Sequence, residues 1–218
     1  MIINSFKGLT ENLKYCVGIN QIEVDPEELS LDKLLKLIEV IQKNHKDTIL
    51  QFFNEKYVLN KEHIFHACYF VQNAFFNKTN ISNKKNIEFF LYLAAKRQIK
   101  LGLEDFGIDN YNINNRRISF CIISSKNNIK QINLEVNKYL GSKDMSLNLE
   151  EMSIEKYKII KNYFNFSNKQ ILTVLKSYGI KINYIERNEK NIVNLFRALN
   201  DLVCEEMALL SLEKTRSN

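Results

Sequence analysis

The stretch ILQFFNEKYVLNKEHIFHACYFVQNAFF, residues 49–76, decides the fold. It opens with a short apolar run, Ile49 to Phe53, for which we predict a buried strand. Asn60 is a residue type that caps helices, and the residues after it predict a helix that runs to about Phe76. A buried strand followed by a long helix predicts a sheet that helices cover.

The residues that flank this stretch add strands and a helix. Apolar residues alternate from Leu13 to Val24 with one phase slip, which predicts either a pair of strands or one bulged strand. The run 118–123 predicts a second buried strand. Between them, Ser30 caps a predicted helix. Its apolar stripe is Leu31, Leu34, Leu35, Ile38 and Ile41.

Further helices are predicted from serine caps, glycine stops and apolar residues at helical spacing. Ser82 is expected to cap one continuous helix over 83–106 that ends at Gly107. Gly141 is expected to stop a helix over 129–139, and Ser153 and Ser167 to start two short ones. The remaining expected elements are a minor strand at 180–184 after a stop at Gly179, and a last helix over 191–212.

These elements predict an α+β fold with a small mixed or antiparallel sheet covered by helices. Strands cluster early in the chain, and helical stretches lie between and after them. No linker rich in proline, glycine or serine interrupts the sequence and no internal repeat is present, so we expect residues 1–218 to form a single domain.

Composition places the chain among ordinary globular proteins that stay inside the cell. Apolar residues make up 45% of the 218 residues and charged residues 26%. The N-terminus lacks the series typical of a signal peptide, no segment is long and apolar enough to span a membrane, and four scattered cysteines suit reduced thiols. We therefore expect a cytoplasmic protein that does not bind membranes. The net charge of +6 favours contact with phosphates or an acidic partner.

The sequence contains no recognisable catalytic motif. The glycine-rich turns GxGxxG and GxxxxGK[ST] that cradle nucleotide phosphates are missing, and so is GxSxG. His63 and His66, in the segment EHIFHAC, supply only two ligands where zinc needs three or four. We interpret them as a pair on the surface of a helix, one imidazole being hydrogen-bonded near the helix start. The expectation is a protein without enzymatic activity, cofactor or metal.

Within the expected helix 83–106, a step of 100° per residue places Gln98 in the apolar stripe. A buried amide needs hydrogen-bond partners, so Gln98 is expected either to satisfy buried backbone groups of a strand or to line a small polar pocket. Lys96, Arg97 and Lys100 lie away from the centre of the stripe, open to solvent or to phosphate.

Several short motifs recur along the chain in a recognisable order. They include Gln51 before an aromatic pair, Glu62 and His63 at the start of a helix, and Glu88. The remaining motifs are Ala67, Arg97-Gln98-Ile99, Phe106-Gly107-Ile108, YFNFSNKQIL at 163–172 and VCEEMALLSLEK at 203–214. Together they resemble those of the kinase-regulatory subunit of the KEOPS complex, the TPRKB-like family, and the resemblance covers most of the chain. The excess length relative to the family is expected at 109–117 and 177–189, and contacts there cannot be carried over.

The resemblance implies a role in tRNA modification. Members of the family join an assembly that installs threonylcarbamoyladenosine next to the anticodon. The implied role is regulatory: the subunit binds and stimulates the small atypical kinase/ATPase subunit, and archaeal members capture the 3′ CCA end of tRNA. The catalytic metal and the nucleotide would belong to the partner subunits.

Two candidate surfaces follow. For the kinase subunit we select the last helix, which carries Met207, Leu209 and Leu212 outside its main apolar stripe, although these residues could equally be core. For tRNA we select a basic rim of Lys61, His63, Lys96, Arg97 and Lys100, with Gln98, Phe65 and Tyr69 beside it to hold an unstacked base.

Two other hypotheses stay open. A basic domain that binds structured RNA without a partner protein is the main alternative. An enzyme with a pocket around Gln98, His63 and Arg97 is the third, and the lack of an evident pair of nucleophile and base counts against it.

Overall fold

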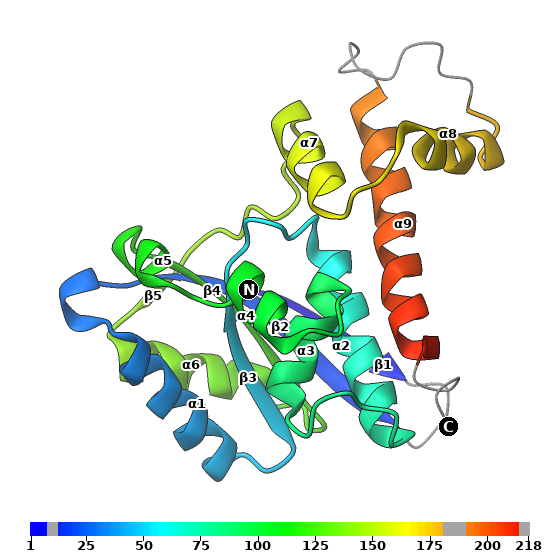
Figure 1. Ribbon diagram of the computed structural model, residues 1–218. Helices are drawn as coiled ribbons and strands as arrows, with labels where there is room; N and C mark the ends of the chain where they lie inside the picture. The colour runs from blue at the N-terminus through cyan, green and yellow to red at the C-terminus, as the bar shows by residue number, and fades with distance from the viewer. Residues whose placement is uncertain (8–12, 181–190, 214–218) are drawn as a thin grey trace.

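An antiparallel sheet lies at the centre of the molecule (Figure 1). The computed structural model describes residues 1–7, 13–180 and 191–213. The described strands are β1 (Ile2–Lys7), β2 (Lys14–Glu23), β3 (Thr48–Phe53), β4 (Arg117–Ser124) and β5 (Lys143–Asp144). Their order is β1-β2-β4-β3, and β5 pairs with the end of β2 that β1 leaves uncovered. The predicted α+β class is confirmed, while β1 was not anticipated from the sequence.

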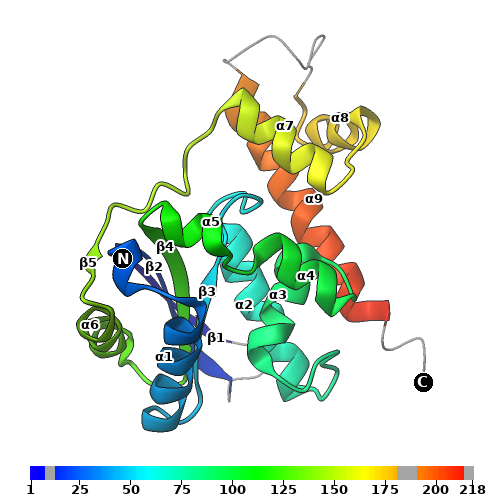
Figure 2. The same ribbon diagram turned by 60° about the vertical axis from the view of Figure 1, so that its left-hand side comes forward.

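Helices cover both faces of this sheet, as the two views together show (Figures 1 and 2). On one face lie α1 (Leu31–Asn44) and α6 (Ile129–Leu140), and on the other α2 (Lys61–Phe76), α3 (Lys85–Ala94) and α9 (Ile192–Glu213). Every residue of β3 is buried as a result. On α6, Ile129 fits against β2 because Gly18 has no side chain there: an added Cβ would lie 2.3 Å from Ile129 Cγ2.

The phase slip in the pattern of β2 has a simple cause. The strand pairs with β4 residue for residue, from Cys16 opposite Ser124 to Glu23 opposite Arg117, so the prediction of two strands or a bulge is wrong. Its earlier apolar residues pack under α2, whereas Ile22 packs on the opposite face of the sheet. A strand buried on both faces can move its apolar residues from one face to the other without any change in the backbone.

Most predicted helix ends are confirmed. Ser30, Asn60, Ser153 and Ser167 each accept a hydrogen bond from the backbone N–H three residues later. The residues Gly141 and Gly179 follow helix ends with positive φ, as expected of stops. The other described helices are η1 (Pro26–Glu28), α4 (Ile99–Phe106), α5 (Asn110–Asn114), α7 (Ile154–Tyr163) and α8 (Asn168–Ser177). The minor strand predicted at 180–184 lies almost entirely outside the described residues.

The apolar stripe of α1 differs from the predicted one. Leu34, Leu37 and Ile41 form its buried centre, while Leu35 is 59% exposed and Leu31 is also open to solvent. These exposed leucines line an apolar hollow of about 290 Å³ between α1 and α4. The helix therefore has a narrower buried face than five apolar positions suggest.

The predicted helix 83–106 is two helices, α3 and α4. Ser82 does not cap it; instead the buried carboxylate of Glu88 accepts hydrogen bonds from the N–H groups of Ile81 and Ser82 and holds the preceding loop. The break occurs at Ala95, whose φ of 48° and ψ of 41° are left-handed. The chain then folds back, and Gly102 of α4 packs against the carbonyl of Phe90.

The break also changes the position of Gln98. In a continuous helix this residue would face the core, but the turn at Ala95 resets the helical phase and places Gln98 directly before α4, where it is exposed. The prediction of an inward-pointing amide is therefore wrong. Local spacing could not reveal the break, because Ala95 is a strong helix former in an unusual backbone conformation.

Replacement of Ala95 by glycine distinguishes the two arrangements by the sign of its effect. At a left-handed residue, Ala95→Gly should raise the free energy of unfolding by about 0.5–1 kcal/mol, because glycine has no Cβ to strain. In a continuous helix the same change should lower it by about 1 kcal/mol. Ala94→Gly, one residue earlier in helical conformation, is the matched control and should destabilise. Denaturant titration measures the free energy of unfolding of the wild type and of both variants. A destabilised Ala95→Gly variant would contradict the break.

Candidate functional site

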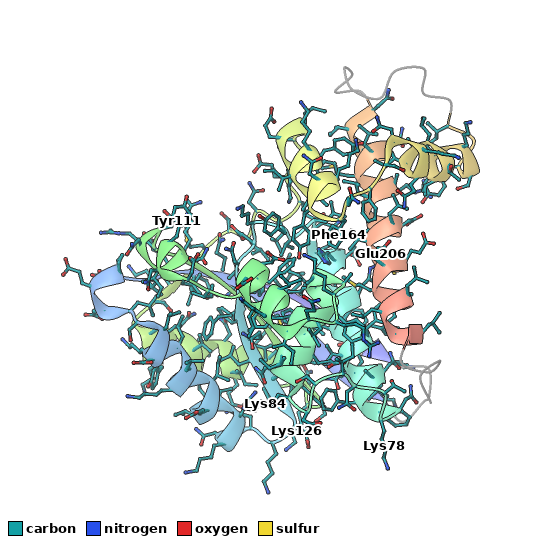
Figure 3. All side chains as sticks on the ribbon, in the orientation of Figure 1. Lys78, Lys84, Tyr111, Lys126, Phe164 and Glu206 are labelled. Carbon is teal, nitrogen blue, oxygen red and sulfur yellow. The ribbon has the colours of Figure 1, made fainter. Side chains whose placement is uncertain are left out.

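The turn between α3 and α4 and the C-terminal half of α9 enclose a groove of about 470 Å³, which we call the α9 groove. It combines residues that the sequence assigned to two separate surfaces, since Lys96, Arg97 and Gln98 face Leu209 across it. Glu206, labelled in Figure 3, also contributes from α9. The full lining is Ala95, Lys96, Arg97, Gln98, Leu101, Glu206, Leu209 and Leu210.

The positively charged side chains of this region differ in their surroundings. The Nζ of Lys96 lies 3.0 Å from a carboxylate oxygen of Asp105 and 4.3 Å from the ring centre of Tyr163. Lys100 is 84% exposed, and its only described ion pair is a loose one of 3.7 Å to Glu104. Arg97 is exposed at the turn. Lys96 is therefore partly neutralised, while Lys100 offers its charge to solvent.

The three residues selected on α9 have different environments. Met207 is fully buried, so its assignment to an interface is wrong and it belongs to the core. Leu209 and Leu212 are 46% and 54% exposed. The reason is that α9 contacts α2, α3, α7 and α8, which bury more of its circumference than one sheet face would. Leu209 and Leu212 nevertheless remain about half exposed near the C-terminal end of α9.

The structure separates the other two members of the predicted basic rim from the α9 groove. Lys61 is at the start of α2, where its Nζ lies 3.7 Å from Glu150, and it is not among the groove residues. His63 is fully buried. The rim as predicted does not exist as one surface, and His63 cannot contact RNA.

His63 instead links the start of α2 to the end of α3. Its Nδ1 accepts a hydrogen bond from the N–H of Leu59 at 3.2 Å, and its Nε2 donates to the carbonyl of Leu93 at 3.0 Å. This pattern requires the neutral imidazole with the proton on Nε2. Burial lowers the pKa of His63 from 6.5 to about 3. The predicted hydrogen bond near the helix start is present, but on a core residue.

The aromatic residues proposed to hold a base are also turned inward. Phe65 is buried, with its ring centre 5.2 Å from that of Phe6. Tyr69 is half-buried, with its ring 5.5 Å from that of Phe70. Neither aromatic residue lines the α9 groove, so the groove offers charge, an amide and apolar surface but no exposed ring.

Residues that carry the family resemblance also prove to be buried hydrogen-bonding groups. Gln51 donates to the carbonyl of Phe52 and accepts from Asn86, which ties β3 to α3. In the same way, Glu88 accepts hydrogen bonds from the loop before α3, and His63 joins the start of α2 to the end of α3. Buried polar groups of this kind specify how elements pack, so these residues support the fold rather than a surface function.

Sequence reasoning missed a third hollow, a polar cleft of about 480 Å³ where β3 and β4 meet α5. Glu55 comes from the loop after β3, and Tyr111 and Asn115 from α5 and its end, within the segment 109–117 that was expected to be extra. The pair Asn54-Glu55 directly after a buried strand was the available signal. The other expected extra segment, 177–189, lies largely outside the described residues.

Two searches of the described residues give negative findings. In that part of the chain, no three histidine, cysteine, aspartate or glutamate side chains lie together as metal ligands would. None of the described helices has both the length and the apolar character that crossing a membrane requires.

The depressed pKa of His63 predicts a dependence of stability on pH. The unfolded chain takes up this proton near pH 6.5 and the folded one only near pH 3, so the unfolded state binds more protons between these values. The free energy of unfolding should therefore fall on acidification from pH 6.5, by up to about 1.4 kcal/mol per pH unit.

Denaturant titrations between pH 7 and pH 5, above the range in which most carboxylates titrate, measure this slope. His63→Gln should lower stability at pH 7 and reduce the slope, because glutamine does not titrate. His66→Gln, on the next turn of α2, tests a half-buried imidazole whose pKa burial also lowers, and it should reduce the slope less than His63→Gln does. Equal slopes for the wild type and His63→Gln would contradict the neutral buried imidazole.

No protein-family model matches the chain, and a search of curated proteins finds no significant match.

Proposed function

We propose that this protein is a non-catalytic subunit of a KEOPS-type tRNA-modifying assembly. In this role it binds the small kinase/ATPase subunit and holds the 3′ end of tRNA. The observation that carries the proposal is the α9 groove, in which Arg97 and Gln98 lie opposite Leu209. Together with the resemblance of its motifs to the kinase-regulatory subunit, this arrangement favours a binding surface for RNA next to one for protein.

The turn between α3 and α4 is suited to RNA. Lys100 presents an exposed positive charge, which attracts phosphates, and Arg97 adds a guanidinium to the same turn. Gln98 presents an amide that can donate to and accept from a base edge. Because Gln98 is exposed rather than buried, it is available to a ligand. Lys61 and His63 do not take part, since the first lies elsewhere and the second is in the core.

The end of α9 is suited to a protein partner. Leu209 and Leu212 are large apolar residues that remain half exposed beside well-packed neighbours such as Met207. Apolar residues at the centre of an interface lose contact with water on binding, and truncation of such a residue costs about 2 kcal/mol or more when it is a hot spot. We therefore place the kinase contact on these two leucines.

The kinase contact is tested with the double variant Leu209→Ala/Leu212→Ala. It should weaken binding of the small kinase/ATPase subunit by about thirtyfold, the equivalent of about 2 kcal/mol, while melting stays near wild type because both side chains are exposed. Titration calorimetry and thermal melting are the measurements.

Leu134→Ala is the matched control, since Leu134 is also exposed but lies on α6, and kinase binding should not change. Met207→Ala should instead destabilise the fold by about 2–5 kcal/mol, as for other core truncations. Unchanged kinase binding by the double variant would refute this interface, and failure of any kinase or KEOPS subunit to co-purify with the protein would refute the role.

The RNA contact is tested by salt dependence. Arg97→Ala should lower tRNA affinity and reduce the slope of log affinity against log salt by about 0.7, because one phosphate contact is lost. Lys126→Ala is the control, since this exposed lysine, labelled in Figure 3, lies after β4 and is not among the residues that line the α9 groove. Fluorescence anisotropy at four salt concentrations supplies both quantities.

A second comparison tests capture of the 3′ end. A tRNA that lacks its terminal CCA should bind much more weakly than the intact molecule. Equal binding of the two would refute end capture and leave a nonspecific electrostatic patch. Tight binding of intact tRNA without any kinase partner in the cell would favour the alternative, an independent basic RNA-binding domain.

A further inference from the structure

Glu206 is the acidic residue in the lining of the α9 groove, and Figure 3 labels it on α9. Its side chain is half-buried. Leu210 follows four residues later and lines the same groove, because residues at this spacing share a face of a helix. A carboxylate repels the phosphates of RNA. Its place in a groove that we assign to RNA therefore indicates a contact with a part of the nucleotide other than the phosphate.

Charged and apolar groups are arranged so that a phosphate and a base would occupy different places. Lys100 is highly exposed and does not line the groove, so a phosphate can bind it outside the groove. Inside the groove, Ala95 and Leu101 offer apolar surface on one side, and Leu210 offers it from α9. The volume of about 470 Å³ is within the range of sites for small molecules. The groove therefore suits the flat apolar faces of a nucleobase.

The bases of the 3′ CCA end present one kind of hydrogen-bond donor at their edges. Cytosine carries an exocyclic amine at N4 and adenine carries one at N6, and both amines donate. A carboxylate accepts hydrogen bonds, whereas the amide of Gln98 both donates and accepts. Glu206 and an exocyclic amine are therefore a matched pair. Gln98, which lines the same groove, can donate to a ring nitrogen of the base.

We propose that Glu206 recognises the base in the α9 groove by accepting a hydrogen bond from the exocyclic amine of a cytosine or of the adenine at the RNA 3′ end. This inference rests on the proposed capture of that end and names the residue that selects it. A carboxylate accepts about four hydrogen bonds, and the contact with the amine uses one. Uracil has a carbonyl oxygen where cytosine has its amine, so it would place two acceptors against each other. The groove should therefore prefer cytosine to uracil.

A cationic side chain of a partner protein is the other group that a carboxylate attracts. Leu209, which we assign to the kinase contact, belongs to the same lining. Lys96 and Arg97 also line the groove, so a cation of the partner would approach two like charges. The phosphate of a nucleotide is instead attracted by these charges. The charges of the groove therefore favour RNA as the ligand of Glu206.

The test uses a short fluorescent RNA that ends in CCA, titrated with the full-length protein and followed by anisotropy. Three analogues each lack one exocyclic amine: pyrimidin-2-one riboside replaces the first or the second cytidine, and purine riboside replaces the adenosine. We expect one of the three to bind about tenfold more weakly than the parent RNA, since a hydrogen bond to a charged group is lost. The other two should bind nearly as the parent does, and the weak analogue identifies the nucleotide in the groove.

Variants of Glu206 then assign the contact. Glu206→Ala should abolish the difference between the parent RNA and the weak analogue, because no acceptor remains. Glu206→Gln should restore part of it, since its amide oxygen accepts without a charge. Either change removes a repulsion that acts on every RNA, so the ratio of the two affinities is the readout. Glu205→Ala is the matched control: Glu205 is exposed and does not line the groove, and the ratio should keep its wild-type value.

Equal binding of the parent RNA and all three analogues, or a wild-type ratio in a folded Glu206→Ala variant, would refute recognition by Glu206. Preference for the CCA-ending RNA over one without CCA would then still support end capture, and lack of that preference would refute the proposed function instead. A Glu206→Ala variant that loses the kinase subunit but keeps the ratio would assign Glu206 to the protein interface and overturn the inference. Thermal melting shows whether this variant is folded. If it is not, the analogue series on the wild type and on Glu206→Gln decides.

Discussion

The whole structure depends on the burial of the central strands on both faces. Every residue of β3 is buried, and so is every residue of β4 after Arg117. Two layers of helices are needed to achieve this, α1 and α6 on one side and α2, α3 and α9 on the other. The close approach of α6 rests on one residue, Gly18, whose missing side chain leaves room for Ile129. Removal of apolar surface from water on both faces is the main stabilising contribution.

Two groups of polar residues in this interior are held by hydrogen bonds. Asn20 donates to Asn133 and to Asp144, which ties β2 to α6 and β5, although within the described residues no group donates to its own Oδ1. Gln21 and Ser119 both donate to Glu55. Each group has one exposed member, Asp144 in the first and Glu55 in the second, and the second group opens into a cleft. A buried network with one exposed member is oriented by the core and still accessible to a ligand.

The α9 groove arises from a different constraint, the reversal of the chain at Ala95. A short left-handed turn brings α4 back along α3 and exposes Arg97 and Gln98 at its tip. The carbonyl of Leu93, two residues before this turn, accepts a hydrogen bond from the buried ring of His63, which anchors the end of α3. Because α9 lies against both α2 and α3, its exposed Leu209 comes to face the same turn.

The sequence by itself determined the features that depend on neighbouring residues. Caps such as Ser153 and Ser167 and stops such as Gly141 act within one helical turn, so the fold class and most helix starts were predictable. Only the tertiary structure decided which apolar and polar residues are buried. Met207 is in the core because four helices surround α9, and the contact of Glu55 with Ser119 joins residues 64 positions apart. Burial depends on partners that are distant along the chain, and the spacing of residues within one segment carries no information about them.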